Sequence, residues 1–274
     1  MPFHRAVSTG LSVWPVVAAI AAGAIVAAPA WADSCSAKSG PQRVPLVELY
    51  TSEGCDSCPP ADRWLSSNFP VDATGAKSIA LAFHVDYWDR LGWKDRFASP
   101  AWTERQHAAS RANRASFVYT PQVLFQGKDF PEWRGQSVNA RAAAAAAMPA
   151  RASVALDAEA RPGAIAVKAS AHVPASGDRK GSALYVALAD SRLVSDVKAG
   201  ENAGVRLTHD HVVRALRGGF TVNGNGDADA IVTLPLPSEA GEATTLVAFV
   251  QNAQTGDVLQ ALELRVAAAC APPR

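Results

Sequence analysis

Two cysteines separated by two residues offer the clearest chemistry in this sequence. Cys55 and Cys58 follow a short apolar run and stand at the start of a helix-forming segment, for which Asp56 or Ser57 is the expected N-cap. A thiolate at a helix N-terminus is stabilised by the helix dipole, so a thiol pair there can exchange disulfides. We expect Cys55 to be the exposed nucleophile and Cys58 the shielded thiol that resolves a mixed disulfide. Asp56 opposes this role because its charge disfavours a neighbouring thiolate.

Other uses of the pair stay open at this point. Cys55 and Cys58 could form a purely structural disulfide, or half of a zinc site, although no second cysteine pair or suitably spaced histidine pair completes four ligands. A copper site made of both sulfurs and His84 is a further alternative. Redox use is favoured because a CxxC pair between a strand and a helix is typical of redox proteins.

The residues around the pair predict an alternating α/β fold. Apolar runs over residues 44–50 and 79–85 are typical of buried strands, and the helix between them, which ends near Asn68, makes them parallel partners. A second helix is expected after Ser99-Pro100, over about 101–114. A strand over 118–125 and a strand over 130–134, joined by a turn at 127–129, predict a β-hairpin. Ser137 can then cap a last helix, which contains the alanines of 142–147. The order β-α-β-α-β-β-α, over about residues 44–148, is the thioredoxin topology.

That topology brings two further features near the cysteines. Thr120-Pro121 directly precedes the third strand, where thioredoxin-like proteins carry a cis-proline loop that faces the CxxC pair. We therefore expect a cis bond there, and a Thr120 backbone that pairs with an extended substrate segment. Glu48 lies in the first strand, near where such enzymes keep a buried acid, and it could accept the proton of Cys58. The favoured interpretation is a strand glutamate that is paired or solvated at the sheet edge.

Several histidines could also contribute. His84 and Asp86 end the second strand, whose carboxyl end should face the same crevice as the cysteines, so they could tune the pKa of a thiol. A hydrogen-bonded pair that holds the aromatic loop after this strand is the simpler alternative. His209 and His211 could share one face of a strand as metal ligands, but a surface pair is favoured. We predict no resident metal and no cofactor.

From residue 150 onward the sequence predicts strands alone. Seven short apolar runs are separated by Gly, Pro, Asp and Asn, over residues 153–156, 164–173, 184–189, 211–216, 231–236, 246–250 and 258–266. Strands without convincing helices predict a β-sandwich-like region. Roughly 240 residues after residue 32 suggest two domains. We place a thioredoxin-like domain at 41–149 and an all-β, sandwich-like domain at 150–274.

The first 32 residues have the order of a secretory signal peptide. His4 and Arg5 precede an apolar stretch over 11–28, and Ala30-Trp31-Ala32 provides small residues for cleavage. A retained membrane anchor, or a lipid anchor at Cys35, is the weaker alternative. We therefore expect a periplasmic or secreted protein without a stable membrane span after cleavage.

Charge and cysteine number narrow the partners. The formal net charge of +1 falls to 0 without Arg5, so the chain offers no basic field for nucleic acid.

Exported cysteines are usually paired, and four cysteines allow three pairings. The close spacing of Cys55 and Cys58 leaves Cys35 with Cys270, at opposite ends of the chain, as a structural disulfide. Two free or intermolecular thiols are the alternative.

Four strings carry a family resemblance: VELYTSEGCDSCPPAD, FHVDYWDRLGWKDRFASP, YTPQV and GENAGVRLTHDHVVR. With them the sequence resembles, over nearly its whole length after residue 32, the exported bacterial proteins described as domain of unknown function 1223. The resemblance implies export, a thioredoxin-like domain and a β-rich C-terminal region, but no substrate. The dipeptide Asp56-Ser57 differs from those of the best-known thioredoxin-like oxidants and reductants, so the direction of electron flow stays open.

The sequence thus predicts a thiol-disulfide oxidoreductase. Its partners would be the thiols or disulfides of exported proteins, or a dedicated redox partner. Cys55 would attack, Cys58 would resolve, and Thr120-Pro121 would position the substrate. The alternatives are a chaperone for copper or another metal, and a non-catalytic binding module in which the disulfide only staples a loop.

Overall fold

The computed structural model describes residues 1–3, 35–72, 78–238, 243–266 and 270. The predicted signal peptide over residues 1–32 falls almost wholly outside this set. The described residues from Cys35 onward belong to one compact unit. None of the helices in the described part of the chain has the length and apolar character needed to cross a bilayer.

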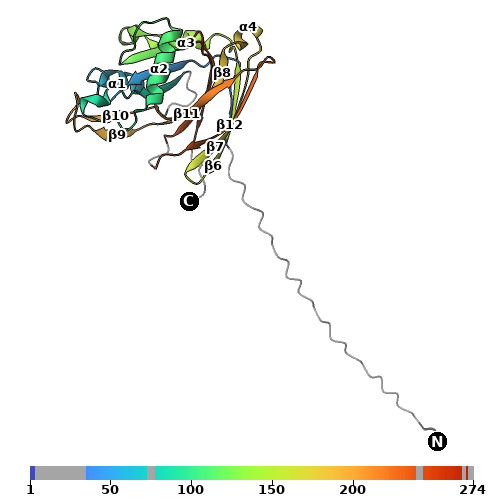
Figure 1. Cartoon of the computed structure of the whole chain (residues 1–274). Coiled ribbons are helices and arrows are strands. Elements are labelled where there is room, and N and C mark those ends of the chain that lie inside the picture. The colour runs from blue at the N-terminus through green and yellow to red at the C-terminus, as the bar shows by residue number, and fades with distance from the viewer. Residues whose placement is uncertain (4–34, 73–77, 239–242, 267–269, 271–274) are drawn as a thin grey trace. The chain divides into compact units, whose positions relative to one another are not determined.

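The described chain is a mixed α/β protein with few helices and several sheets (Figure 1). Its helices are α1 (Pro59–Asn68), α2 (Pro100–Ala112), α3 (Val138–Ala146) and α4 (Ser176–Arg179), with 3-10 turns η1 (Asp89–Leu91) and η2 (Pro131–Arg134). Its strands are β1 (Cys35–Lys38), β2 (Leu46–Thr51), β3 (Ile79–His84), β4 (Gln122–Phe125), β5 (Lys128–Asp129), β6 (Ser153–Arg161), β7 (Ala164–His172), β8 (Ser182–Asp190), β9 (Leu193–Asp196), β10 (Arg206–His209), β11 (Val212–Thr221), β12 (Asp227–Pro235), β13 (Thr245–Asn252) and β14 (Val258–Arg265).

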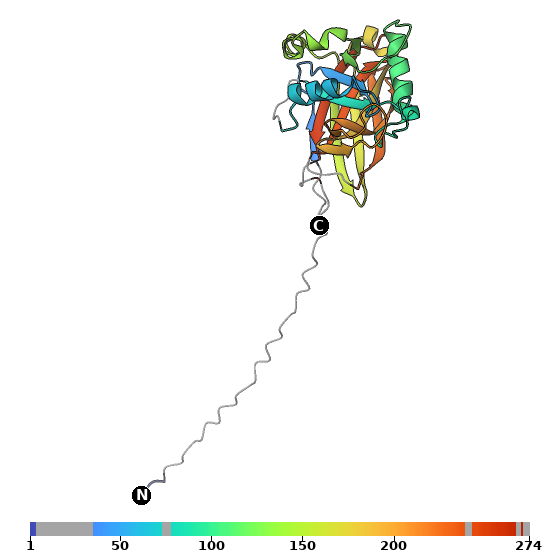
Figure 2. The ribbon, with the colours of Figure 1, turned by 90° about the vertical axis from the view of Figure 1, so that its left-hand side faces the viewer.

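The N-terminal half has the element order that the sequence predicts. β2 and β3 are parallel neighbours joined through α1, while β4 runs antiparallel to β2 and β5 antiparallel to β4. Both faces of β2 are buried, since its odd residues pack with α1 and its even residues lie toward α2. Figure 2 shows α1 (cyan) in front of the sheet, with the C-terminal strands (orange to red) behind it.

Two local expectations are wrong in this half. α1 begins at Pro59 with Cys58 as its N-cap residue, so neither Asp56 nor Ser57 caps the helix. Residues 130–134 do not continue the hairpin, because Pro131 cannot donate to a ladder and instead starts η2. The hairpin strand is therefore limited to Lys128–Asp129.

The C-terminal half is built from strands, as its apolar runs predict. Each of the seven predicted runs overlaps a strand, and β9, β10 and α4 are additional. β1, β6, β7 and β12 form a four-stranded antiparallel sheet. Its buried face shares a core with β8, β11, β13 and β14, as Leu156, Ile165, Leu188 and Leu246 illustrate.

The two halves share one eight-stranded sheet, ordered β14-β13-β8-β11-β3-β2-β4-β5. β11 joins β3 in parallel, with Val212 opposite Ala82, and the Ala82 amide donates to the His211 carbonyl. A core cluster on one face combines residues from both sides of position 150, among them Phe83, Trp102, Val213 and Phe249. The sequence boundary at 149/150 is therefore not a break in the sheet.

Cys35 and Cys270 form a disulfide that joins β1 to the far end of the chain. Their Cα atoms lie 5.6 Å apart across a sequence separation of 235 residues. A bridge across so long a loop strongly restricts the unfolded chain, which is how a disulfide of this kind stabilises a fold.

Candidate active site at the Cys55–Cys58 disulfide

The disulfide between Cys55 and Cys58 lies in the turn between β2 and α1. Their Cα atoms are 5.4 Å apart, and the Cys58 carbonyl accepts the amides of Ala61 and Asp62 in the first turn of α1. Both cysteines are fully buried, with an exposed fraction of 0%. The expected location is therefore observed, but the expected exposure of Cys55 is not.

The Thr120–Pro121 loop faces this disulfide. The Thr120–Pro121 peptide bond is cis, as the sequence predicts, and the Thr120 hydroxyl lies 3.5 Å from the Cys55 Sγ atom. The indole Nε1 of Trp88 donates to the same hydroxyl at 2.7 Å. Trp88 thus fixes the threonine against the sulfur, a contact that the sequence did not indicate.

The dipeptide Asp56-Ser57 is exposed, and hydrogen bonds connect it and its neighbours to residues of the C-terminal half. The Asp56 amide donates to the Glu201 carboxylate at 3.0 Å, and the Ser57 hydroxyl lies 3.4 Å from the Cys55 Sγ atom. The Asn202 Nδ2 atom donates to the carbonyls of Glu53 and Cys55, both at 2.9 Å. These contacts connect the CxxC turn to the loop between β9 and β10.

Glu48 does not lie behind Cys58, which corrects the predicted placement. Glu48 lies on the face of β2 opposite α1, where Arg105 of α2 pairs with it at 2.9 Å. The Tyr50 hydroxyl donates to the same carboxylate at 3.1 Å. The parity of the strand explains the difference, because Val47 and Leu49 face α1 and so Glu48 cannot.

Asp62 is the buried carboxyl group on the α1 side. It lies one helical turn after Cys58, is 7% exposed, and accepts the Thr51 hydroxyl at 3.2 Å. Burial raises the pKa of Asp62, against the lowering effect of His209 and His84. A carboxyl group in this position can exchange a proton within the site, and Asp62 was not among the residues singled out from sequence.

His84 is buried and pairs with a carboxylate. Its Nδ1 atom lies 2.6 Å from Asp95 Oδ2, and its ring stacks edge-on against His209, with centroids 4.9 Å apart. Asp86 turns away to α2, where its carboxylate accepts the Thr103 hydroxyl at 2.5 Å. His84 therefore adjoins the disulfide turn through Asp95, while Asp86 holds the loop after β3.

Glu53, just before the CxxC turn, completes this buried polar cluster. Its Oε1 atom lies 3.2 Å from His209 Nε2, and its Oε2 atom accepts the Trp93 indole N–H at 2.7 Å. Its amide donates to Asp95 at 2.9 Å. Burial alone would raise the pKa of Glu53, but the neighbouring His209 and Ser195 and the hydrogen bond from Trp93 outweigh it and hold that pKa below its usual value.

The His84–Asp95 pair predicts a specific pH dependence of stability. Burial disfavours both charges, but their mutual attraction lowers the pKa of Asp95 to about 2 and raises the pKa of His84. The stabilisation of the fold by the Asp95 carboxylate is complete above pH ~4 and is lost as the pH falls through ~2. The stabilisation of the fold by protonated His84 is complete below pH ~6.5. It is lost as the pH rises through the pKa that His84 has in the folded protein.

We therefore expect Asp95→Asn to lower the free energy of unfolding by about 2 kcal/mol between pH 4 and 6.5, with a shrinking difference toward pH 2. Urea unfolding at a series of pH values measures this. His172 and Asp227 provide a matched control, since they pair at 2.7 Å but are about half exposed. Asp227→Asn should change stability by under about 1 kcal/mol. A pH-independent loss in Asp95→Asn would contradict the prediction.

His211 lies in a different environment from His209, although only one residue separates them. Both are buried, at 8% and 2% exposure, so the expected surface pair is wrong. His211 has φ +58°, which interrupts the strand and reverses the side-chain alternation. Its Nε2 atom donates to the Phe69 carbonyl at 2.7 Å.

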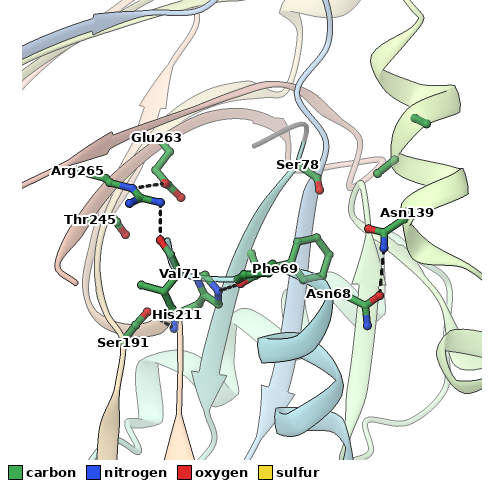
Figure 3. A pocket seen from close by; sticks show the side chains of 14 residues that line it. Asn68, Phe69, Val71, Ser78, Asn139, Ser191, His211, Thr245, Glu263 and Arg265 are labelled. Atoms are coloured by element: carbon green, nitrogen blue, oxygen red, sulfur yellow. Dashed lines mark hydrogen bonds and ion pairs between the residues drawn. The ribbon is translucent and has the colours of Figure 1, made fainter. Parts of the chain in front are cut away.

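His211 lines a cavity of about 340 Å³ that is separate from the disulfide (Figure 3). The C-terminal end of α1, the start of β3, α3 and the ends of β13 and β14 surround it. Glu263 and Arg265 form an ion pair at 4.0 Å on one wall, and Phe69 and Val71 provide apolar surface. Neither cysteine of the CxxC pair lines this cavity.

The arrangement of acids, histidines and sulfurs does not form a metal centre in this state. Among the described residues, no group of three or more His, Cys, Asp or Glu side chains is arranged to hold a metal ion. What the site offers is a disulfide at a helix start, a polar threonine against one sulfur, and a buried set of groups that can exchange protons.

These features define a class: an α/β protein with a disulfide at a strand–helix junction and a β-rich C-terminal half. Within that class, the chain belongs to the family described as Protein of unknown function (DUF1223), whose family model matches residues 46–251. The resemblance noted from the sequence is thereby confirmed. A comparison with curated proteins gave no match.

Several solved structures are similar to this chain, among them the following two. A crystal structure of a protein from Agrobacterium tumefaciens is 28% identical, with a TM-score of 0.56 over 82% of this chain and 95% of the other. HBP35 of Porphyromonas gingivalis is 14% identical, with a TM-score of 0.59 over 82% of this chain and 75% of the other. The second likeness concerns the fold alone.

Proposed function

We propose that this protein is a thiol-disulfide oxidoreductase that exchanges disulfides with exported proteins through Cys55 and Cys58. The proposal includes a periplasmic or secreted location. It also treats the N-terminal half as thioredoxin-like and the paired sheets of the C-terminal half as sandwich-like. The partners would be protein dithiols or disulfides, and the reaction needs no cofactor.

One observation carries the proposal: the disulfide ends at the N-cap of α1, and the hydroxyl of Thr120, next to a cis-proline, lies 3.5 Å from the Cys55 sulfur. A helix N-terminus favours an anion, so it favours the thiolate that exchange requires. The Thr120 loop provides a polar group beside the sulfur that a partner would attack. The pairing of β4 with β2 and the hydrogen bond from Trp88 hold this loop beside the CxxC turn.

In the proposed reaction a protein dithiol is the reductant and the Cys55–Cys58 disulfide is the oxidant. A partner thiolate attacks the Cys55 sulfur, a new S–S bond forms, and the Cys55–Cys58 bond breaks with Cys58 leaving as a thiolate. Cys58 takes up a proton, for which Asp62 is the nearest buried carboxyl group along α1. The second partner thiolate then attacks the partner sulfur of the mixed disulfide and releases Cys55. The partner loses two electrons and the Cys55/Cys58 pair gains them.

A second candidate function is favoured by the burial of the pair. Because both cysteines are 0% exposed, the disulfide could act only as a staple in a binding module. Structural disulfides have reduction potentials below about −300 mV, whereas exchangeable ones lie higher. The reduction potential of the Cys55/Cys58 couple therefore separates the two functions.

Trapping tests the exchange directly. In the reverse direction the Cys55 thiolate attacks a partner disulfide and Cys58 resolves the mixed disulfide. Cys58→Ala lacks that resolving thiol, so a mixed disulfide between Cys55 and a partner disulfide should persist. We expect covalent adducts with exported proteins on non-reducing gels, and their loss on reduction. The double variant Cys55→Ala/Cys58→Ala is the matched control, because it keeps Cys35–Cys270 and should form no adduct.

A folded Cys58→Ala protein whose Cys55 thiol forms no adduct with a protein disulfide, or with glutathione disulfide, would contradict the proposal. A potential below about −300 mV would point the same way, toward a staple.

A further inference from the structure

The hairpin of β9 and β10 lies against the backbone of the CxxC turn. Its connecting segment, residues 197–205, is here called the cover loop. Asn202 of this loop is itself 7% exposed and donates to the carbonyls on both sides of Gly54. Glu201 accepts the Asp56 amide. The loop thus binds the backbone of the CxxC turn at three points, two of them on the residues that flank Gly54.

The cover loop is internally braced and would move as a unit. The amides of Val197 and Gly204 bond the carbonyls of Val205 and Val197 respectively, at 3.0 and 2.9 Å. Gly200 has φ +76°, and a Cβ atom there would lie 3.3 Å from the Trp93 Cβ, so the loop rests closely on the aromatic segment after β3. In Figure 1 the hairpin lies beside α1, which β10 contacts.

The hairpin is held by a few buried apolar side chains and by polar contacts with the site. β9 and β10 form their own two-stranded sheet, separate from the eight-stranded ladder. Its buried apolar side chains in the described chain are Leu193, Val197 and Leu207, and of these Leu193 joins a small apolar cluster with Phe97 and Val212. The remaining contacts of the hairpin with the site are polar: Asn202, Glu201 and His209. Polar contacts are readily exchanged for water, so such a unit opens more easily than the sheet core.

Both ends of the hairpin carry a non-glycine residue in the left-handed region. Arg192, directly before β9, has φ +61°, and His211, two residues after β10, has φ +58°. Such positions are strained for residues with a Cβ atom and are found at hinges and functional sites. These two residues flank the hairpin, so a change in their backbone angles would move it relative to the eight-stranded sheet.

We infer that the β9–β10 hairpin is a gate over the disulfide, and that Asn202 is its principal latch and a positioning residue for exchange. This inference rests on the proposed function, since it supplies the access that exchange with a protein thiol requires. Glu201 also disfavours the Cys55 thiolate. Its carboxylate accepts the Asp56 amide, and it therefore competes with the thiolate for the N–H donors of this turn. In the open state, water or the partner's backbone N–H groups would satisfy the carbonyls that Asn202 leaves.

The rate of disulfide reduction in the folded protein tests the gate. Dithiothreitol is used in excess under native conditions, thiols are alkylated at timed intervals, and the Cys55/Cys58 peptide is followed by mass spectrometry. Loss of two hydrogen bonds to buried carbonyls should raise the open population, so Asn202→Ala should be reduced about 10- to 100-fold faster. Asn202→Asp, which keeps the size but loses the donor, should act in the same direction. Glu201→Gln should shift the pH profile of Cys55 alkylation downward.

Asn113 provides a matched control. Its Nδ2 atom also donates to two carbonyls, those of Ala109 and Gly127, both at 2.9 Å, but at the end of α2. Asn113→Ala should leave the reduction rate of Cys55–Cys58 within about threefold while lowering the unfolding free energy comparably. The Cys35–Cys270 disulfide is an internal reference whose rate should not change in Asn202→Ala.

Two results would overturn the gate: an unchanged reduction rate in both Asn202 variants, or an equal acceleration in Asn113→Ala, which would indicate global unfolding. These outcomes are separate from those of the proposed function. Faster reduction without trapped partners would support the gate but contradict exchange, and trapped partners with unchanged reduction would do the reverse.

Discussion

A fragment that ends at residue 149 is expected not to fold cooperatively, even though the sequence pattern places a domain boundary there. In the structure β3 is an interior strand, because β11 pairs with it on the side away from β2. Removing residues 150–274 would expose that edge and one side of the core around Phe83 and Trp102, which includes Val213, Phe249 and Ala261. A domain has only about 5–15 kcal/mol of net stability, so losing one side of a core is enough to unfold it.

Circular dichroism and thermal melting of residues 41–149, compared with residues 33–274, measure this effect. The longer chain should melt in one sharp transition, and the fragment should show a broad one with weak near-ultraviolet signal. A cooperative melt and a dispersed NMR spectrum for the fragment would show that the N-terminal half folds alone. Adding the separate 150–274 chain should restore structure to the fragment if the shared sheet is what it lacks.

The sequence was sufficient for the elements but not for the long-range pairing between the halves. The runs 44–50 and 79–85 and the helix between them give β2, α1 and β3, because local periodicity determines local structure. The pairing of Val212 with Ala82 joins residues that are far apart in sequence, and no local pattern records it. Hydrophobic runs show that a strand is buried, but not which strand covers its edge.

The site was predictable to the same extent. Cys55, Cys58 and the cis bond at Thr120–Pro121 follow from spacing and topology. Strand parity showed that Glu48 and Val47 face opposite sides, but not which side α1 would cover. Asn202 contacts the CxxC turn from the β9–β10 hairpin, and its only sequence signal is the string GENAGVRLTHDHVVR in the family resemblance. His209 contacts Glu53 from the same hairpin, whereas its spacing from His211 suggested only a surface pair or metal ligands.

Arg105→Ala is expected to destabilise the protein by about 3–5 kcal/mol, the largest effect of a single side chain here. Arg105 pairs with Glu48 at 2.9 Å, donates to Gln251 at 2.9 Å, and lies over the ring of Phe249 at 5.3 Å. It therefore connects α2 to both β2 and β13. Without the guanidinium, the fully buried Glu48 carboxylate would have no cation, and its Oε1 atom already lacks a hydrogen-bond partner.

The same reasoning predicts that much of this loss can be recovered. A buried ion pair costs desolvation on both sides, so replacing both charges is milder than removing one. Glu48→Gln/Arg105→Met should be destabilised by under about 2 kcal/mol, because Gln still accepts the Tyr50 hydroxyl and Met still packs on the rings. Arg161→Ala is the control, since its pair with Glu159 at 3.5 Å is more than half exposed and should contribute under about 1 kcal/mol. Urea unfolding of the unmodified protein and the three variants measures the differences in unfolding free energy. A double variant less stable than Arg105→Ala would show that Arg105 acts mainly through packing rather than through the charge of Glu48.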